Sequence, residues 1–219
     1  MAHGVAGTRT VQVGAGTVRL QGDLVLPEGA TGVVLFAHGS GSGRHSPRNR
    51  YVAGVLHERA LGTLLIDLLT LQEEREDAFT GHLRFDIPLL AERLVGATDW
   101  ILSEPETARL KIGYFGASTG GGAALVAAAE RPEAVAAVVS RGGRPDLAGE
   151  ALPRVQAPTL LIVGGNDTPV IQMNRSAFAQ MRAVKKVEIV PGASHLFEEP
   201  GTLEEVARLA ADWFEKYLA

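Results

Sequence analysis

The chain has 219 residues, no cysteine and a formal net charge of -4 at neutral pH. This length fits a single domain with one core, so we expect residues 1–219 to form one unit. The weakly acidic balance provides no positive field for nucleic acid. The absence of cysteine excludes a disulfide framework, a thiolate metal site and a cysteine nucleophile.

The sequence also argues against a membrane protein and a metalloprotein. Residues 1–7 lack the basic and apolar blocks of a secretory signal, and no apolar run reaches the roughly 20 residues of a membrane-spanning helix. We therefore expect a cytoplasmic protein without a membrane partner. The six histidines show no spacing typical of metal ligands, so neither a metal nor another cofactor is expected. The sequence makes no prediction of the oligomeric state.

The first predicted elements are two strands, at 10–13 and 18–26, joined by a glycine-containing turn at 14–17. They indicate an antiparallel hairpin. A nucleotide-binding fingerprint is the alternative for these glycines, but it needs a third glycine and a helix directly afterwards, whereas the sequence continues as a strand.

After the hairpin, short apolar runs alternate with longer helical stretches. The runs are typical of strands buried on both faces of a parallel sheet, and they lie at 33–37, 63–66, 111–115, 135–139, 159–163 and 187–190. Helices are predicted at 47–60, 86–103, 119–130, 169–183 and 202–218. The charged run at 73–77 is interpreted as a solvated loop or helix turn. The prediction is an α/β fold with a mostly parallel, doubly wound sheet, an antiparallel start, helices on both faces and no cap domain.

A G-x-S-x-G motif, Gly116-Ala117-Ser118-Thr119-Gly120, falls between a predicted strand and a predicted helix. In a nucleophile elbow, a sharp turn at this place exposes the serine hydroxyl, and glycines stand where a Cβ would collide. The turn also puts Ser118 at a helix N-terminus, where the helix dipole favours developing negative charge. A glycine-rich helix start in an ordinary α/β protein is the alternative, and the position after a strand favours the nucleophile.

A serine nucleophile needs a base, and the base needs an orienting acid. Asp167 and His195 each follow a predicted strand, so both belong at the carboxyl edge of the sheet. The chain order Ser118, Asp167, His195 matches the order in α/β-hydrolases. Alternatively, Asp167 caps the next helix and His195 is a surface turn residue.

The loop at 38–45 follows the first parallel strand and is the expected source of an oxyanion donor. We predict the backbone N–H groups of Ser40 and Thr119 as the two donors, with Gly41 as an alternative to Ser40. His38 is interpreted as a structural loop residue. A phosphate-cradling loop is disfavoured because the G-x-x-x-x-G-K pattern and its lysine are missing.

Several arginines are predicted near the same edge of the sheet. Arg44 lies near the end of the oxyanion loop, Arg48 and Arg50 come directly after it, and Arg141 follows a strand. Because guanidinium groups bind carboxylates well, Gly41, Arg44 and Arg141 are candidate substrate contacts. Internal ion pairing or solvation of these arginines is the alternative.

With these residues placed, the chain resembles the dienelactone-hydrolase-like branch of the α/β-hydrolase superfamily over roughly residues 20–218. The motifs of the resemblance lie at 38–43, 116–120, 164–167 and 192–195. The resemblance implies a triad of Ser118, Asp167 and His195 and hydrolysis of a carboxylic ester, thioester or lactone. Dienelactone hydrolases proper use a cysteine nucleophile, and this chain has Ser118 instead.

The predicted function is hydrolysis of small esters through an acyl-enzyme on Ser118, with a small-molecule substrate as the partner. The segment at 141–158 is too short for a lid domain, which predicts an open pocket. Thioesterase, amidase or perhydrolase chemistry on the same triad and a catalytically silent binding module remain as alternatives.

Overall fold

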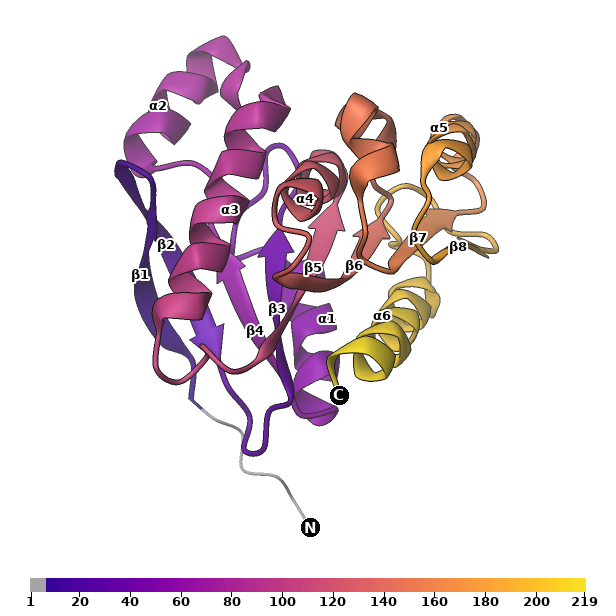
Figure 1. Cartoon of the computed structure of the whole chain (residues 1–219). Coiled ribbons are helices and arrows are strands. Elements are labelled where there is room, and N and C mark those ends of the chain that lie inside the picture. The colour runs from indigo at the N-terminus through magenta and orange to yellow at the C-terminus, as the bar shows by residue number, and fades with distance from the viewer. Residues whose placement is uncertain (1–6) are drawn as a thin grey trace.

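Eight strands form one sheet in the computed structural model, which describes residues 7–219 (Figure 1). The sequence analysis expected no secretory signal at the start of the chain. Residues 1–6 of that segment lie outside the described residues. The strand order is β1-β2-β4-β3-β5-β6-β7-β8. Strand β2 is antiparallel to both β1 and β4, and the remaining neighbours pair in parallel. The predicted mostly parallel sheet with an antiparallel hairpin is confirmed.

Each predicted strand is present. The bounds are β1 Arg9–Ala15, β2 Val18–Val25, β3 Gly32–Ala37, β4 Leu61–Ile66, β5 Lys111–Ala117, β6 Val135–Arg141, β7 Thr159–Gly164 and β8 Lys185–Val190. The hairpin turn contracts to two residues, and Gly16 occupies it with a φ of 61°, a conformation that glycine adopts without strain.

Helices cover both faces of the sheet (Figure 1). Helices α1 (Pro47–Glu58) and α6 (Thr202–Leu218) pack together on one face. The other face carries α3 (Ile87–Ser103), α4 (Thr119–Glu130) and α5 (Thr168–Gln180). No helix among residues 7–219 combines the length and apolar character needed to cross a membrane.

The core consists of two apolar layers, one on each side of the sheet. Successive strand residues point to opposite faces, so Leu35 and Tyr114 lie in the layer that contains α3 and α4, whereas Phe36 and Phe115 lie beneath α1 and α6. The rings of Phe36 and Phe115 have centroids 4.9 Å apart. Because both faces are covered, the central strands are apolar at nearly every position, which is why their sequences predict strands so well.

The charged run at 73–77 forms part of a helix, α2 (Leu71–Thr80), so of the two interpretations the loop is wrong and the helical one holds over ten residues. The Thr70 side chain accepts a hydrogen bond from Glu73 N, and Glu73 Oε2 accepts one from Thr70 N at 2.7 Å. This capping box was readable from the sequence as T-x-x-E.

Helix α2 is attached to the rest of the protein by ion pairs. Asp77 is 2% exposed and pairs with Arg84, from the short helix η1 (Leu83–Phe85). Glu73 pairs with the buried Arg93 of α3 at 2.7 Å. A second short helical segment, η2 (Pro145–Arg154), fills the connection between β6 and β7.

The chain reverses its direction of winding at β3 and β5. From β3 the chain first moves to β4 on one side, and later to β5 and then outward on the other side. In such sheets the loops at the carboxyl ends of the two strands diverge and leave a crevice. The loop after β3 and the turn after β5 meet there, and the loops after β7 and β8 join them from the same edge.

Candidate active site

Ser118 connects β5 to α4 with a φ of 50° and a ψ of -122°. This region of φ and ψ is strained for a residue with a side chain, so the surrounding structure must hold it. Although Ser118 occupies the N-cap position of α4, its side chain makes no capping hydrogen bond. The hydroxyl is therefore free for chemistry at a helix N-terminus, as a nucleophile elbow requires.

Gly120 allows the elbow to lie against β3. A Cβ on Gly120 would stand 2.2 Å from Ala37 O and 2.6 Å from His38 O, both of which are backbone atoms that cannot turn aside. We expect Gly120→Ala to lower the free energy of unfolding by about 3 kcal/mol or more, because β3 and α4 must separate. Urea denaturation followed by circular dichroism measures this.

Gly54 is the matched control, because a Cβ there meets nothing within 4 Å in the middle of α1. Gly54→Ala should leave stability unchanged or raise it by about 0.5–1 kcal/mol. Equal stabilities of the two variants would contradict the close approach of α4 to β3.

Asp167 and His195 come together from two different loops. His195 Nδ1 lies 2.6 Å from Asp167 Oδ2. Asp167 occupies the N-cap position of α5, yet its side chain makes no capping hydrogen bond. The carboxylate is thus turned toward the histidine rather than toward its own helix, which favours the orienting role over the capping alternative. With Nδ1 held by the acid, Nε2 is the ring nitrogen left to act on a substrate or a serine.

Ser118 and His195 line one cavity of about 220 Å³ at the switch point of the sheet. The structure therefore brings the three predicted residues to one place. The remaining walls come from the oxyanion loop, the start of α1, the end of β6 and the loop after β8, and comprise Gly39, Ser40, Ser42, Ser46, Arg48, Asn49, Ala117, Arg141 and Leu196. Ser46 and Asn49, at the start of α1, were missed by the sequence analysis, which read that helix only as a crossover.

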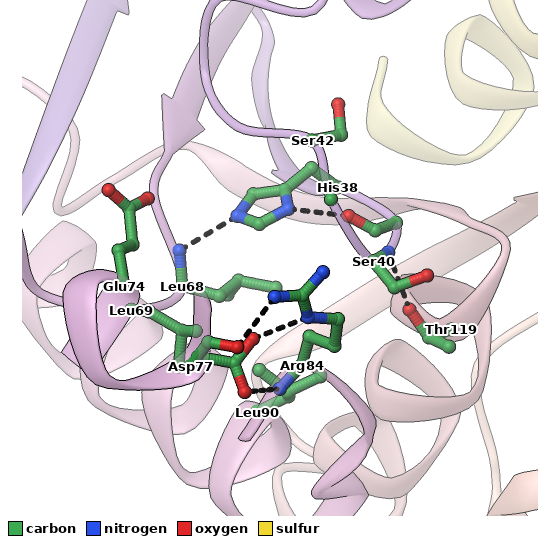
Figure 2. Close-up of a pocket in the computed structure, with 12 residues that line it drawn as sticks. His38, Ser40, Ser42, Leu68, Leu69, Glu74, Asp77, Arg84, Leu90 and Thr119 are labelled. Carbon is green, nitrogen blue, oxygen red and sulfur yellow. Dashed lines mark hydrogen bonds and ion pairs between the residues drawn. The ribbon is translucent and has the colours of Figure 1, made fainter. Parts of the chain in front are cut away.

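The loop after β3 reaches the elbow through a side chain. Ser40 N donates a hydrogen bond to Thr119 Oγ1 at 3.0 Å (Figure 2). In this structure the Ser40 N–H already has a partner, so it must leave Thr119 before it can serve an oxyanion. Gly41 lies on the far side of the same loop and lines a neighbouring cavity. The Thr119 hydroxyl, which the sequence analysis did not consider, fixes the loop that carries the predicted donor.

That neighbouring cavity lies beside the oxyanion loop and has a volume of about 230 Å³. Figure 2 shows it between the loop and α2, with Leu68, Leu69 and Leu90 along its walls and the Arg84 and Asp77 ion pair within it. Gly39, Ser40 and Ser42 line both cavities. The oxyanion loop thus separates the cavity that Ser118 lines from a second cavity, which combines leucine side chains with the charged groups of Glu74, Asp77 and Arg84.

His38 is a structural residue, as the sequence analysis expected. Its Nδ1 donates to Gly39 O at 2.9 Å, and its Nε2 accepts from Leu68 N at 2.9 Å (Figure 2). The neutral imidazole satisfies both bonds, and burial lowers its pKa below the usual value of 6.5. The ring therefore ties the oxyanion loop to the segment after β4.

This burial predicts a loss of stability in acid. The folded protein binds the His38 proton less readily than the unfolded chain does, so the stabilisation is complete above pH 6.5 and is lost as the pH falls through and below that value. His57 acts in the same direction through its own burial. A glutamine at position 38 can accept from Leu68 N without titrating.

We expect the unfolding free energy of the wild-type protein to fall between pH 7 and pH 5 and that of His38→Gln to fall less. The difference in slope is at most about 1.4 kcal/mol per pH unit, the value for one proton. Urea titrations across this range measure it. Superimposable pH profiles for the two proteins would contradict the neutral, buried imidazole.

The two arginines predicted as substrate contacts, Arg44 and Arg141, line different cavities. Arg44 pairs with Asp67, whose Oδ1 also accepts from Arg44 N at 2.7 Å, and Arg44 lines a different cavity from Ser118. Arg50 lies 3.4 Å from Asp23. The structure thus places Arg44 in an internal ion pair and outside the cavity that Ser118 lines, which favours the ion-pairing alternative. Arg141 does line the cavity of Ser118.

The described residues contain no group of three or more histidine, aspartate or glutamate side chains placed to hold a metal ion. The arrangement that they do contain is chemically suited to acyl transfer. It combines a free serine hydroxyl, a histidine held by a carboxylate and backbone N–H groups at a helix N-terminus.

Comparisons with known proteins agree with this architecture. The chain matches the Dienelactone hydrolase family over residues 71–219. It is 67% identical to a crystal structure of a dienelactone hydrolase from Anabaena variabilis, with a TM-score of 0.96 over 97% of this chain and 99% of that chain. A dienelactone hydrolase-like promiscuous phosphotriesterase, P91 from metagenomic libraries, has a TM-score of 0.78 at 21% identity over 99% of this chain and all of that chain, which shows a shared fold.

A longer relative comes from Mycobacterium tuberculosis and carries a provisional phosphoribosyl transferase name. It is 59% identical over 208 residues, which cover 95% of this chain and 46% of that protein. The chain therefore spans about half the length of the curated relatives that it matches. Since the family match covers more than half of this chain and the fold is that of the α/β-hydrolases, the chain belongs to the dienelactone hydrolase family.

Proposed function

We propose that this protein is a serine hydrolase that cleaves carboxylic esters with small acyl groups. The observation that carries the proposal is the placement of Ser118 in a strained elbow beside His195, which Asp167 holds at 2.6 Å. Backbone strain of this kind clusters at functional sites, and together with the histidine and acid it supports catalysis over a binding module. Family membership supports hydrolase chemistry, and the identity of the nucleophile is part of the proposal.

In the proposed reaction, His195 takes the proton of Ser118 as the serine oxygen attacks the acyl carbon. Asp167 keeps the imidazole in the tautomer with hydrogen on Nδ1 and stabilises the imidazolium. The N–H groups of Thr119 and Ser40 receive the oxyanion once Ser40 leaves the Thr119 hydroxyl. The alcohol departs with the proton from His195, and water activated by the same histidine releases the acid.

The two small cavities support a short substrate. Each has a volume of about 220–230 Å³, and no inserted domain encloses them in the described residues. Lactone and thioester cleavage on the same triad are compatible with this space. The transferase name of the longer relative refers to a protein twice this length, and the site of this chain gives no support for that reaction.

A panel of p-nitrophenyl esters of increasing acyl length tests the proposal. We expect turnover to be highest for acetate to butyrate esters and to fall for longer acyl groups. Matched thioesters and amides separate the alternatives on the same triad. Turnover of thioesters or amides with no ester hydrolysis would contradict the proposal, as would an absence of turnover throughout the panel.

A further inference from the structure

Arg141 is a buried cation without an anionic partner. It lies at the end of β6 and is 6% exposed. Its one hydrogen bond among the described side chains runs from Nη2 to Asn49 Oδ1 at 3.4 Å, and its buried Nε has no partner. Burial lowers the pKa of Arg141 to about 10, and the positive charge of Arg48 acts in the same direction. A desolvated, unpaired guanidinium is unfavourable unless a ligand supplies the missing anion.

The unpaired guanidinium belongs to the cavity of Ser118. Arg141 lines that cavity together with Arg48, and the aromatic ring of Phe197 lies beneath its guanidinium at 5.9 Å. Arg48 is one-third exposed and contacts Glu198 at 3.4 Å, which neutralises part of its charge. The guanidinium groups of Arg141 and Arg48 therefore belong to the same cavity as the proposed nucleophile, Ser118.

A third positive contribution comes from α1. Its N-cap residue Ser46 and the first-turn residues Arg48 and Asn49 form one wall of the cavity. The N-terminus of a helix carries about half a positive charge and favours anions. The hydroxyl groups of Ser42 and Ser46 line the same space and can donate to oxygen atoms.

We propose that this cavity binds a doubly charged oxyanion, a phosphate monoester, on the alcohol side of the ester that Ser118 cleaves. Arg141 has no anionic partner and Arg48 is only partly neutralised by Glu198. Their guanidinium N–H groups, with the hydroxyl groups of Ser42 and Ser46, can serve the three terminal oxygens of a phosphate, whereas a carboxylate offers only two oxygens. The acyl group then occupies the leucine-lined part of the cavity across the oxyanion loop, beside Leu68, Leu69 and Leu90 (Figure 2). This inference rests on the proposed function and names the substrate class of the same site.

The test compares three acetate esters that differ only in the group carried by the alcohol: 3-acetoxypropyl phosphate, 4-acetoxybutanoate and neutral propyl acetate. We expect kcat/KM to be about 10- to 100-fold higher for the phosphate ester than for the neutral ester, the range for hydrogen bonds to charged groups. We also expect inorganic phosphate to inhibit p-nitrophenyl acetate hydrolysis competitively.

Arg141→Met tests the residue directly, because methionine keeps much of the volume and removes an unpaired charge. The variant should keep its melting temperature and lose the preference for phosphate, measured as the ratio of kcat/KM for the phosphate ester to kcat/KM for propyl acetate. Arg144→Met is the matched control from the next loop residues, since Arg144 already pairs with Asp146 at 2.7 Å and should keep the preference. If Arg141→Met does not fold, the partly exposed Arg48→Met must show the same loss.

Equal kcat/KM for the three esters, or a preference for the carboxylate ester, would overturn the phosphate subsite. In the same experiment, hydrolysis of p-nitrophenyl acetate by the wild-type protein and by Ser118→Ala is compared. A loss of this hydrolysis in Ser118→Ala shows that the proposed serine hydrolase function stands, whatever the phosphate preference. A phosphate preference that survives in both Arg141→Met and Arg48→Met would also overturn the inference.

Discussion

Ser118→Ala is expected to lower kcat for ester hydrolysis by about 10⁴- to 10⁶-fold, the range for removal of a catalytic serine. Alanine cannot form the acyl-enzyme, and the oxyanion donors alone provide only residual acceleration over water. Because the Ser118 hydroxyl caps no helix, the substitution should leave the melting temperature close to that of the wild-type protein. Steady-state kinetics with p-nitrophenyl acetate and a thermal melt measure the two effects.

Ser176→Ala provides the control for this variant. Ser176 is an exposed serine on α5, and its replacement should change neither turnover nor stability. Near-complete activity in Ser118→Ala would show that the elbow serine is not the nucleophile and would favour a different group in the same cavity.

Asp167→Asn is expected to lower kcat by about 10⁴-fold while leaving the fold intact. The carboxylate accepts the Nδ1–H of His195, whereas an amide can donate to Nδ1 and so favours the tautomer in which Nε2 carries the hydrogen. That tautomer cannot accept the proton of Ser118. Since the Asp167 side chain makes no capping bond to α5, we expect little loss of helix stability.

The size of the effect distinguishes an orienting acid from a structural one. A tautomer effect appears in kcat rather than in KM for a neutral ester. Asp99→Asn removes a surface ion pair with Arg131 and serves as the matched control, with unchanged kinetics expected. Wild-type kcat in Asp167→Asn would contradict the role of Asp167.

The sequence predicted the strands of the sheet because burial on both faces makes each of them a continuous apolar run. Val33–Ala37 and Thr159–Val163 contain only residues suited to such burial. The helix α2 was missed because its residues are charged and make few apolar contacts. The Thr70 and Glu73 capping box signalled its start, but the partners that neutralise Glu73 and Asp77 come from later segments.

The sequence predicted which loops form the candidate site. Motifs after β5, β7 and β8 identify Ser118, Asp167 and His195, since the carboxyl ends of parallel strands meet at one edge. The arginines were not predictable in this way. Arg44 follows β3 and Arg141 ends β6, and only the three-dimensional structure shows that Asp67 neutralises the first while the second stays unpaired. The bond from Ser40 to Thr119 likewise joins residues that lie 79 positions apart.

Covalent labelling with a fluorophosphonate, followed by mass spectrometry of the intact protein and its peptides, tests the central claim most directly. The account predicts one adduct per chain, located on Ser118, and strongly slowed labelling in Asp167→Asn. An unlabelled protein, or an adduct on any residue other than Ser118, would contradict it.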